Sequence, residues 1–244
     1  MAELWLDLYT PRGDTNSDRP VFIYSHGGHF AFGDKSEGFE WATRMAERGY
    51  VTASIDYRLG PLSTVTAPLD EQEQAQVDRA RSDLQAAVRW FRASATELGI
   101  DSDRIGVGGY SAGAVMSAAA AIRSSPAEAL PPAATGSNPE FSSAVCGAVA
   151  IAGAINPALV DAGDAGVIFH HGSADDTVPI AFAVAARDAL LNAGLPVEWH
   201  EYQGDGHEFS DAAQATIEST SIRWLHEHVA TAPYPCSPAV AAGA

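Results

Sequence analysis

The sequence predicts an α/β protein with a mostly parallel central sheet and helices on both faces. Apolar runs rich in β-branched residues alternate along the chain with helical patterns, as they do where crossover helices link parallel strands. Several runs are apolar throughout, which is typical of strands buried on both faces. With 244 residues, 46% of them hydrophobic, the chain is long enough for one substantial core. We expect a single domain over residues 1–230 and a Pro/Ala-rich tail over 231–244.

The strands and helices are expected in alternation. Residues 4–9 alternate in polarity like an edge strand, and residues 20–28 form a buried strand that ends in a glycine turn. Within the longest predicted helix, Leu84, Val88, Phe91 and Leu98 recur at helical spacing and form a stripe directed at the core. Further strands are predicted at 50–59, 99–111, 143–154, 165–173 and 197–204. Helices are predicted at 38–48, 69–98, 112–122, 180–193 and 211–229.

Net charge and hydropathy exclude several classes of function. The formal charge of −17 repels phosphate backbones and anionic lipids, so we expect no nucleic-acid partner and no membrane partner. No run approaches the roughly 20 apolar residues of a membrane span. The N-terminal segment MAELWLDLYT lacks the basic and then apolar order of a signal peptide. The sequence leaves the oligomeric state open.

One serine, Ser111, stands between glycines where a predicted strand passes into a predicted alanine-rich helix. Gly109 and Gly113 flank it in the pattern G-x-S-x-G. The pattern is typical of a nucleophile in a strained strand-to-helix turn, where side chains at the glycine positions would strike neighbouring backbone. The following helix directs its N-terminal N–H groups at the place where an oxyanion forms. The alternative is a serine N-cap with glycines that serve packing.

A serine nucleophile needs a base and an acid, and both have candidates just after predicted strands. Asp175 and Asp176 follow the run 165–173, and His207 lies in a glycine-flanked loop after the run 197–204. Because the carboxyl ends of parallel strands meet at one edge of a sheet, these side chains should lie near Ser111. Of the eight histidines, only His207 is expected late in the chain in a strand-to-helix loop. We therefore predict His207 as the base and one of the two aspartates as the acid.

Seven motifs occur along the chain in a fixed order: LDLYTP, SHGGHFAFGDKS, RGYVTASIDYRL, DLQAAVRWFR, GIDSDRIGVGGYSAG, HGSADDTVP and GDGHEF. Together they resemble the α/β-hydrolase superfamily, and more closely its carboxylesterases of the dienelactone-hydrolase and hormone-sensitive-lipase type. The resemblance implies an α/β-hydrolase fold and a Ser-His-Asp triad that needs no metal or organic cofactor. In the family motif H-G-x-x-D-x-x-V-P the triad acid falls on Asp175, with Asp176 as the adjacent alternative.

The segment HGGHF after the second predicted strand resembles the HGGG-type oxyanion loop of the family. The resemblance implies that the backbone N–H groups of Gly28, His29 and Ala112 bind the oxyanion. His29 replaces the third glycine of the motif. Its N–H still serves as a donor if a residue with a side chain can adopt the local backbone conformation. The His29 side chain then either limits or contacts the substrate, or faces solvent without a role.

Two aromatic residues near this loop, Phe30 and Tyr57, are candidates for lining the substrate cleft. Tyr57 belongs to the segment DYRL, which in the family more often fixes the oxyanion loop than touches substrate. Four further side chains could be considered as metal ligands, but they lack a recognisable ligand spacing, so we expect no metal site; they are His26, His29, His170 and His171.

The number of residues between two predicted strands bears on the size of the substrate. Larger family members insert a helical cap between the strand after the nucleophile and the strand before the acid, but here only residues 155–164 separate them. We therefore expect no cap domain and an open site, suited to acyl chains of about two to six carbons or to exposed esters on larger molecules. The predicted function is a serine carboxylesterase acting on a small-molecule ester. The alternatives are an arylformamidase-like amide hydrolase and a non-catalytic ligand-binding protein.

The chain has two cysteines, Cys146 and Cys236, which are too few for a disulfide framework. Cys146 begins a predicted strand, and Cys236 follows the last predicted helix, which returns to the same edge of the sheet. A disulfide between them is predicted, provided that their Cα atoms lie within about 7 Å; the alternative is two free thiols. The compartment stays open: cytoplasmic by default, extracellular if a leader has been removed and the cysteines are bridged.

Overall fold

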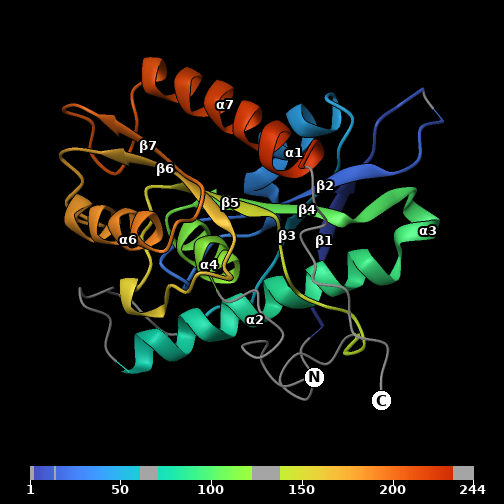
Figure 1. The fold of residues 1–244 in the computed structure, drawn as a ribbon, viewed down its shortest axis with the longest axis horizontal. Helices are drawn as coiled ribbons and strands as arrows, with labels where there is room; N and C mark the ends of the chain where they lie inside the picture. The colour runs from blue at the N-terminus through green and yellow to red at the C-terminus, as the bar shows by residue number, and fades with distance from the viewer. Residues whose placement is uncertain (1–2, 14, 61–70, 123–137, 233–244) are drawn as a thin grey trace.

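The computed structural model describes residues 3–13, 15–60, 71–122 and 138–232. The described residues form a seven-stranded sheet in the order β1-β3-β2-β4-β5-β6-β7 (Figure 1). β1 (Leu6–Tyr9) pairs antiparallel with β3 (Val51–Ile55), and the other neighbouring strands pair in parallel. The remaining strands are β2 (Arg19–Ser25), β4 (Ile100–Tyr110), β5 (Gly147–Ile151), β6 (Gly166–Gly172) and β7 (Val197–Tyr202). The predicted mostly parallel sheet is confirmed.

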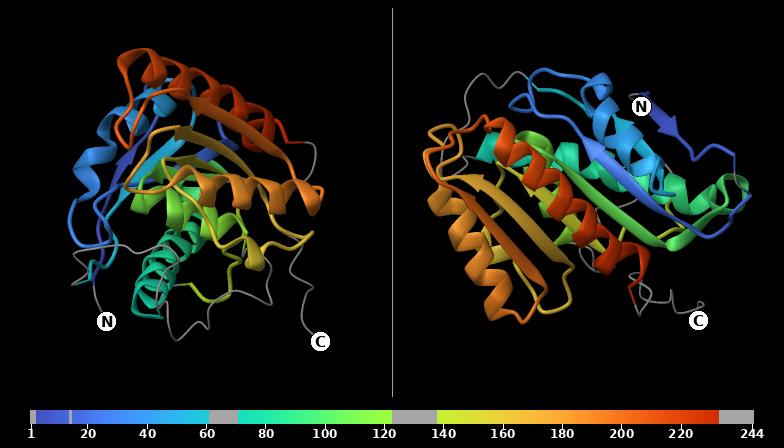
Figure 2. Two further views of the ribbon diagram at one scale, coloured as in Figure 1. Left: turned by 90° about the vertical axis from the view of Figure 1, so that its left-hand side faces the viewer. Right: turned by 90° about the horizontal axis from the view of Figure 1, so that it is seen from above.

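Helices cover both faces of this sheet, as Figures 1 and 2 show. One face carries α1 (Phe39–Ala46) and α7 (Asp211–Leu225), and the other carries α2 (Glu71–Ala93), α4 (Ala112–Ala121) and α6 (Ile180–Asn192). Shorter helical segments are η1 (Lys35–Gly38), α3 (Ala95–Leu98), η2 (Pro157–Leu159) and η3 (His226–Ala230), the last of which continues α7. The structure thus has the predicted α/β layers.

Each central strand contributes to two hydrophobic cores, because successive side chains point to opposite faces. In β2, Val21 and Ile23 belong to the core under α2 and α4, whereas Phe22 and Tyr24 belong to the core under α1 and α7. The same alternation holds in β5 and β6. Burial on both faces explains why these strands appear in the sequence as unbroken apolar runs.

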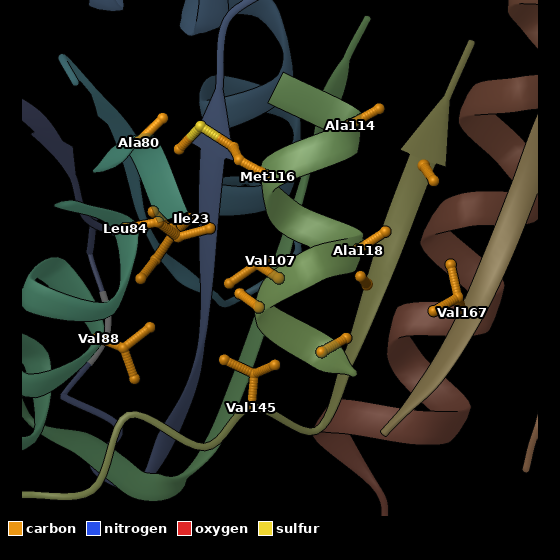
Figure 3. Packing of buried hydrophobic residues seen from close by; sticks show 14 of the residues in the cluster. Ile23, Ala80, Leu84, Val88, Val107, Ala114, Met116, Ala118, Val145 and Val167 are labelled. Atoms are coloured by element: carbon orange, nitrogen blue, oxygen red, sulfur yellow. The ribbon is translucent and has the colours of Figure 1, made fainter. Parts of the chain in front are cut away.

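The larger core is centred on α4. Figure 3 shows Met116 of this helix beside the sheet, with Leu84 and Val88 of α2 in the same cluster. Leu84, Val88 and Phe91 are each 0% exposed, which confirms the predicted stripe within α2, whereas its fourth predicted member, Leu98, is half-buried and belongs to α3. The predicted helix 69–98 is divided in two, because α2 ends at Ala93 and α3 begins after Ser94; residues 69 and 70 lie outside the described residues.

Three strands end earlier than predicted, at Ser25, Ile55 and Ile151. Left-handed residues follow two of them, with φ of 102° at Gly28 and 53° at Ala152, and such residues cannot continue a strand. After β3 the chain leaves the parallel ladder, because the Arg58 N–H donates to the Asp83 carboxylate instead (2.8 Å). The chain therefore turns into loops at the carboxyl edge of the sheet, where the predicted site lies.

The connection between β5 and β6 comprises residues 152–165 and contains only the single turn η2. It holds no inserted helical layer of the kind that caps larger relatives. The residues 233–244 of the predicted tail lie outside the described residues, so the domain boundary remains a prediction. No helix in the described ranges combines the length and the apolar character needed to cross a membrane.

Candidate active site

Ser111 occupies a strained turn between β4 and α4, with φ 55° and ψ −117°. Its N–H donates to the Ile151 carbonyl oxygen (2.8 Å), which ties the turn to β5. A Cβ atom would lie only 2.3 Å from the Ser25 carbonyl oxygen at Gly109 and 2.0 Å from it at Gly113. Only glycine therefore lets the turn pack against the end of β2, which is the steric reason for the G-x-S-x-G pattern.

The structure brings Ser111, His207 and Asp175 into one hydrogen-bonded chain. His207 lies between β7 and α7, and its Nε2 is 2.9 Å from Ser111 Oγ. Its Nδ1 is 2.9 Å from Asp175 Oδ2 in the loop after β6. A carboxylate only accepts, so Nδ1 carries the proton and Nε2 accepts from the serine hydroxyl. The alternative acid, Asp176, is exposed to solvent.

The Asp175 carboxylate accepts three hydrogen bonds and has one longer contact with a histidine nitrogen. Oδ1 accepts from the N–H groups of Thr177 (2.9 Å) and Val178 (2.8 Å). Oδ2 accepts from His207 and lies 3.3 Å from Nε2 of a second histidine, His171. Burial raises the pKa of Asp175, but the donors from the two histidines and the Val178 N–H outweigh burial and hold it well below its usual range. Asp175 is therefore ionised at neutral pH.

The HGG loop after β2 contains three consecutive residues with left-handed backbone: Gly28 (φ 102°), His29 (φ 52°) and Phe30 (φ 59°). The Gly28 carbonyl oxygen accepts from the N–H groups of Ala31 (2.8 Å) and Phe32 (3.1 Å), which closes the loop. His29 thus adopts a conformation that histidine tolerates better than bulky or β-branched residues do. The replacement of the third glycine is compatible with this backbone.

The loop and the start of α4 both lie beside the serine. A Cβ atom on Gly27 would be 3.6 Å from Ser111 Cβ. Ala112 follows Ser111 directly and begins α4, so its N–H belongs to the first helical turn, where N–H groups have no acceptor within the helix. Gly27 and Ala112 therefore bring the HGG loop and the first turn of α4 next to the serine.

Tyr57 and Phe30, the two candidates for lining the cleft, are buried beside the HGG loop. Each is only 3% exposed. The Tyr57 hydroxyl lies 3.0 Å from the His26 carbonyl oxygen and 2.9 Å from that of Gly27, and its ring stacks on His26 at 4.2 Å. Phe30 packs edge-on against Tyr57. The Tyr57 contacts agree with the loop-fixing role considered for the segment DYRL, and contact of either residue with substrate stays a prediction.

The His29 side chain is half-buried. Its ring is edge-on to Phe32, with ring centres 5.8 Å apart and an interplanar angle of 87°. Phe32 is itself 60% exposed. The two predicted alternatives for His29, contact with substrate or a free solvent-facing side chain, are thus joined by a third, in which it packs on Phe32.

A contact that sequence reasoning missed links the serine turn to the histidine loop. The Tyr110 hydroxyl lies 3.0 Å from Glu208 Oε1 and 3.1 Å from the His207 carbonyl oxygen. A cavity of about 430 Å³ between α1 and α7 has Tyr110 and Glu208 in its wall, together with Trp41 and Phe209. Since 98 positions separate Tyr110 from Glu208, no local pattern in the sequence could indicate this pair.

Two remaining predictions concern cysteines and metals. Cys146 is disulfide-bonded, whereas Cys236 lies outside the described residues, so their pairing stays a prediction. Within the described ranges, no group of three or more His, Cys, Asp or Glu side chains is arranged to hold a metal ion.

The strand order, the serine between glycines at the end of β4 and the HGG loop after β2 define an α/β-hydrolase fold. The chain resembles the native esterase Est2 of the Planctomycetes species Thermogutta terrifontis, with a TM-score of 0.77 over 96% of this chain and 91% of that chain, at 22% identity. The BD-FAE family model matches residues 6–138, which is more than half of the chain. The chain belongs to the BD-FAE family.

Two further comparisons also lead to esterases. Thermogutta terrifontis esterase 2 phosphorylated by paraoxon has a TM-score of 0.76 and 25% identity, over 92% of this chain and 89% of that chain. Esterase LipC of Mycobacterium tuberculosis is 30% identical over 118 residues, which cover 48% of this chain and 26% of LipC. The chain spans about a fifth to a quarter of the length of the curated relatives it matches.

Proposed function

We propose that this protein is a serine carboxylesterase that hydrolyses short-chain or exposed esters through an acyl-enzyme on Ser111. The observation that carries the proposal is the hydrogen-bonded chain from Ser111 Oγ through His207 to the ionised Asp175. This arrangement supplies a nucleophile, a base and an orienting carboxylate in the order that acyl transfer needs. The likeness to an esterase that paraoxon phosphorylates supports the proposal.

In the first half of the reaction, Ser111 Oγ attacks the ester carbonyl carbon and its proton passes to His207 Nε2. Asp175 holds the proton on Nδ1 and stabilises the imidazolium that forms. The carbonyl oxygen becomes an oxyanion, which the N–H groups of Gly28, His29 and Ala112 would bind. His207 then returns the proton to the alkoxide, the carbon–oxygen bond breaks and the alcohol leaves.

In the second half, water replaces the alcohol. His207 takes a proton from the water, whose oxygen attacks the acyl carbon and forms a second oxyanion. Collapse of this intermediate releases the carboxylic acid, and the proton returns from His207 to Ser111 Oγ. The cycle consumes one ester and one water, and needs no other reactant.

The short β5–β6 connection supports a preference for small acyl groups. Residues 152–165 contain only η2, so this connection supplies no helical cap to enclose a long chain. We expect the highest kcat/KM for acyl chains of about two to six carbons. An optimum at twelve or more carbons would contradict the open site.

Hydrolysis of p-nitrophenyl acetate, butyrate and laurate by the wild type and by Ser111→Ala tests the proposed function. We expect turnover of the two short esters by the wild type alone. N-formylkynurenine serves as the amide comparison, since an arylformamidase would prefer it to the esters. Absence of turnover with every ester would overturn the proposal.

A further inference from the structure

A second histidine, His171, contacts the Asp175 carboxylate, and the proposed mechanism gives it no role. It is the second-last residue of β6, and its side chain is 0% exposed. Its Nε2 is 2.8 Å from the Val178 carbonyl oxygen and 3.3 Å from Asp175 Oδ2. Its ring lies parallel to Trp199, with an interplanar angle of 7° and 6.5 Å between ring centres.

The surroundings of His171 fix its tautomer. Both neighbours of Nε2 are oxygen acceptors, so Nε2 carries a proton that the two oxygens share. Within the described part of the chain, the buried Nδ1 has no hydrogen-bond partner. A proton on Nδ1 would be a buried donor without an acceptor, which is costly. His171 is therefore a neutral ring that donates from one nitrogen only.

The Nε2–H group of His171 limits the orientations that the Asp175 carboxylate can adopt. Oδ1 is occupied by the N–H groups of Thr177 and Val178. Oδ2 receives His171 on one side and His207 on the other. Because a carboxylate oxygen has about two acceptor directions, the one that remains on Oδ2 points to His207. Without His171, one acceptor direction of the buried Oδ2 would have no donor. The carboxylate could then rotate and accept the His207 hydrogen bond in a second orientation.

We propose that His171 is a positioning residue for the esterase reaction: its Nε2–H holds the Asp175 carboxylate so that Oδ2 presents one acceptor direction to His207. The inference rests on the proposed function. The same hydrogen bond shares the negative charge of Asp175, so it also limits how strongly the carboxylate favours the imidazolium form of His207.

Two variants separate the hydrogen bond from the packing of the ring. His171→Phe keeps a ring against Trp199 but has no donor, whereas His171→Gln has an N–H at the distance of Nε2 but no ring. With p-nitrophenyl butyrate we expect His171→Phe to lower kcat roughly 10- to 100-fold at little change in KM, because a hydrogen bond to a charged group is lost. We expect His171→Gln to stay within about threefold of the wild type.

The pH profile adds a readout that a purely structural role would not move. In His171→Phe less of the Asp175 charge is shared, so we expect the acidic midpoint of kcat/KM to rise by about one pH unit. In His171→Gln the midpoint should match the wild type. Neither substitution alters the other titratable groups around the site, which are Tyr110, Asp205, Glu208 and Arg187, whose guanidinium lies over the Trp199 ring.

Titration with paraoxon gives the concentration of reactive serine, so that kcat refers to folded, competent sites. If His171→Phe does not fold, His171→Leu takes its place as the variant without a donor. The inference is overturned if the Phe variant matches the wild type while the Gln variant is impaired. It is also overturned if both variants lose activity with an unchanged acidic midpoint.

A substrate-free measurement keeps this inference separate from the proposed function. The proton between His207 Nδ1 and Asp175 gives a low-field NMR resonance in the free protein. We expect the resonance to be unchanged in His171→Gln and shifted in His171→Phe. Failure of the wild type to hydrolyse esters would overturn the proposed function alone, whereas an unchanged resonance in His171→Phe would overturn the role of His171.

Discussion

Two consecutive histidines of β6 face opposite sides of the sheet and meet different partners. His170 points towards α7, where its Nδ1 lies 3.0 Å from the Tyr202 hydroxyl and its Nε2 lies 2.9 Å from Ser221 Oγ. His171 points to the other side and contacts the Asp175 carboxylate. Both rings are 0% exposed, so the difference lies in the partners and not in burial.

The partners decide what each histidine can do. Hydroxyl groups can donate or accept, so they satisfy both nitrogens of a neutral His170, and burial holds the pKa of His170 well below its usual value. The Asp175 carboxylate is a buried negative charge that only accepts hydrogen bonds. It contacts His207, which gains a proton during the proposed reaction. His170 with its hydroxyl partners joins β6 to α7, whereas His171 lies beside the carboxylate that orients the proposed base.

The largest expected effect comes from removing the nucleophile. Ser111→Ala should lower kcat/KM for p-nitrophenyl butyrate by roughly 10⁵-fold or more, because no acyl-enzyme can form. The control is Ser219→Ala, at an exposed position on α7, which should match the wild type. Retention of more than a tenth of the activity in Ser111→Ala would place the chemistry elsewhere.

The next effect distinguishes the two adjacent aspartates. Asp175→Asn should lower kcat about 10⁴-fold, because an amide in place of the carboxylate favours the wrong tautomer of His207. Asp176→Asn, at an exposed position, should leave kcat within about twofold. Equal losses in the two variants, measured with the same ester, would contradict the assignment of Asp175 as the acid.

Removal of the other histidine should affect stability and leave catalysis unchanged. In His170→Phe the Tyr202 and Ser221 hydroxyls lose their partner, which should cost about 1–3 kcal/mol of unfolding free energy at pH 8. The Tm in thermal unfolding and the midpoint in denaturant titrations should both fall. The kcat per paraoxon-reactive site should stay within about twofold of the wild type. A large loss of kcat at full stability would show that His170 also serves the reaction.

The same variant should change the pH dependence of stability. The pKa of His170 is depressed in the folded state and about 6.5 when unfolded, so the unfolded chain binds the proton more readily. The contribution of the neutral ring is complete above about pH 6.5 and decreases at lower pH, by up to about 1.4 kcal/mol per pH unit. Between pH 7 and pH 5 the unfolding free energy of His170→Phe should therefore fall less steeply than that of the wild type. Equal slopes would contradict a buried neutral His170.

The smallest effect is expected at His29, where the proposed donor is backbone and not side chain. Since glycine also adopts a left-handed conformation, His29→Gly should keep the N–H in place and hydrolyse p-nitrophenyl acetate within about threefold of the wild type. A tenfold or greater loss would show that the imidazole itself takes part in binding or catalysis.

Sequence patterns predicted the sheet, Ser111 and His207, whereas the choice of Asp175 over Asp176 came from the resemblance to the family motif. This was achievable because Asp175 and His207 each closely follow a predicted strand, and parallel strands bring such loops to one edge of the sheet. The positions of Phe30 and Tyr57 were not predictable in the same way, since they depend on the left-handed backbone at Phe30 and on a contact between Tyr57 and Gly27, 30 positions apart. Tyr110 and Glu208 meet across the fold, and their contact leaves no periodic signal in the chain.

The most direct test of the account is covalent labelling of the serine. Incubation with paraoxon, followed by mass spectrometry of the digested protein, should find one diethylphosphoryl group per chain on the peptide that contains Ser111. Labelling should be absent in Ser111→Ala and slower in Asp175→Asn, since the base would lack its orienting carboxylate. A wild-type protein that hydrolyses esters but carries no label at Ser111, or carries it on another residue, would contradict the account.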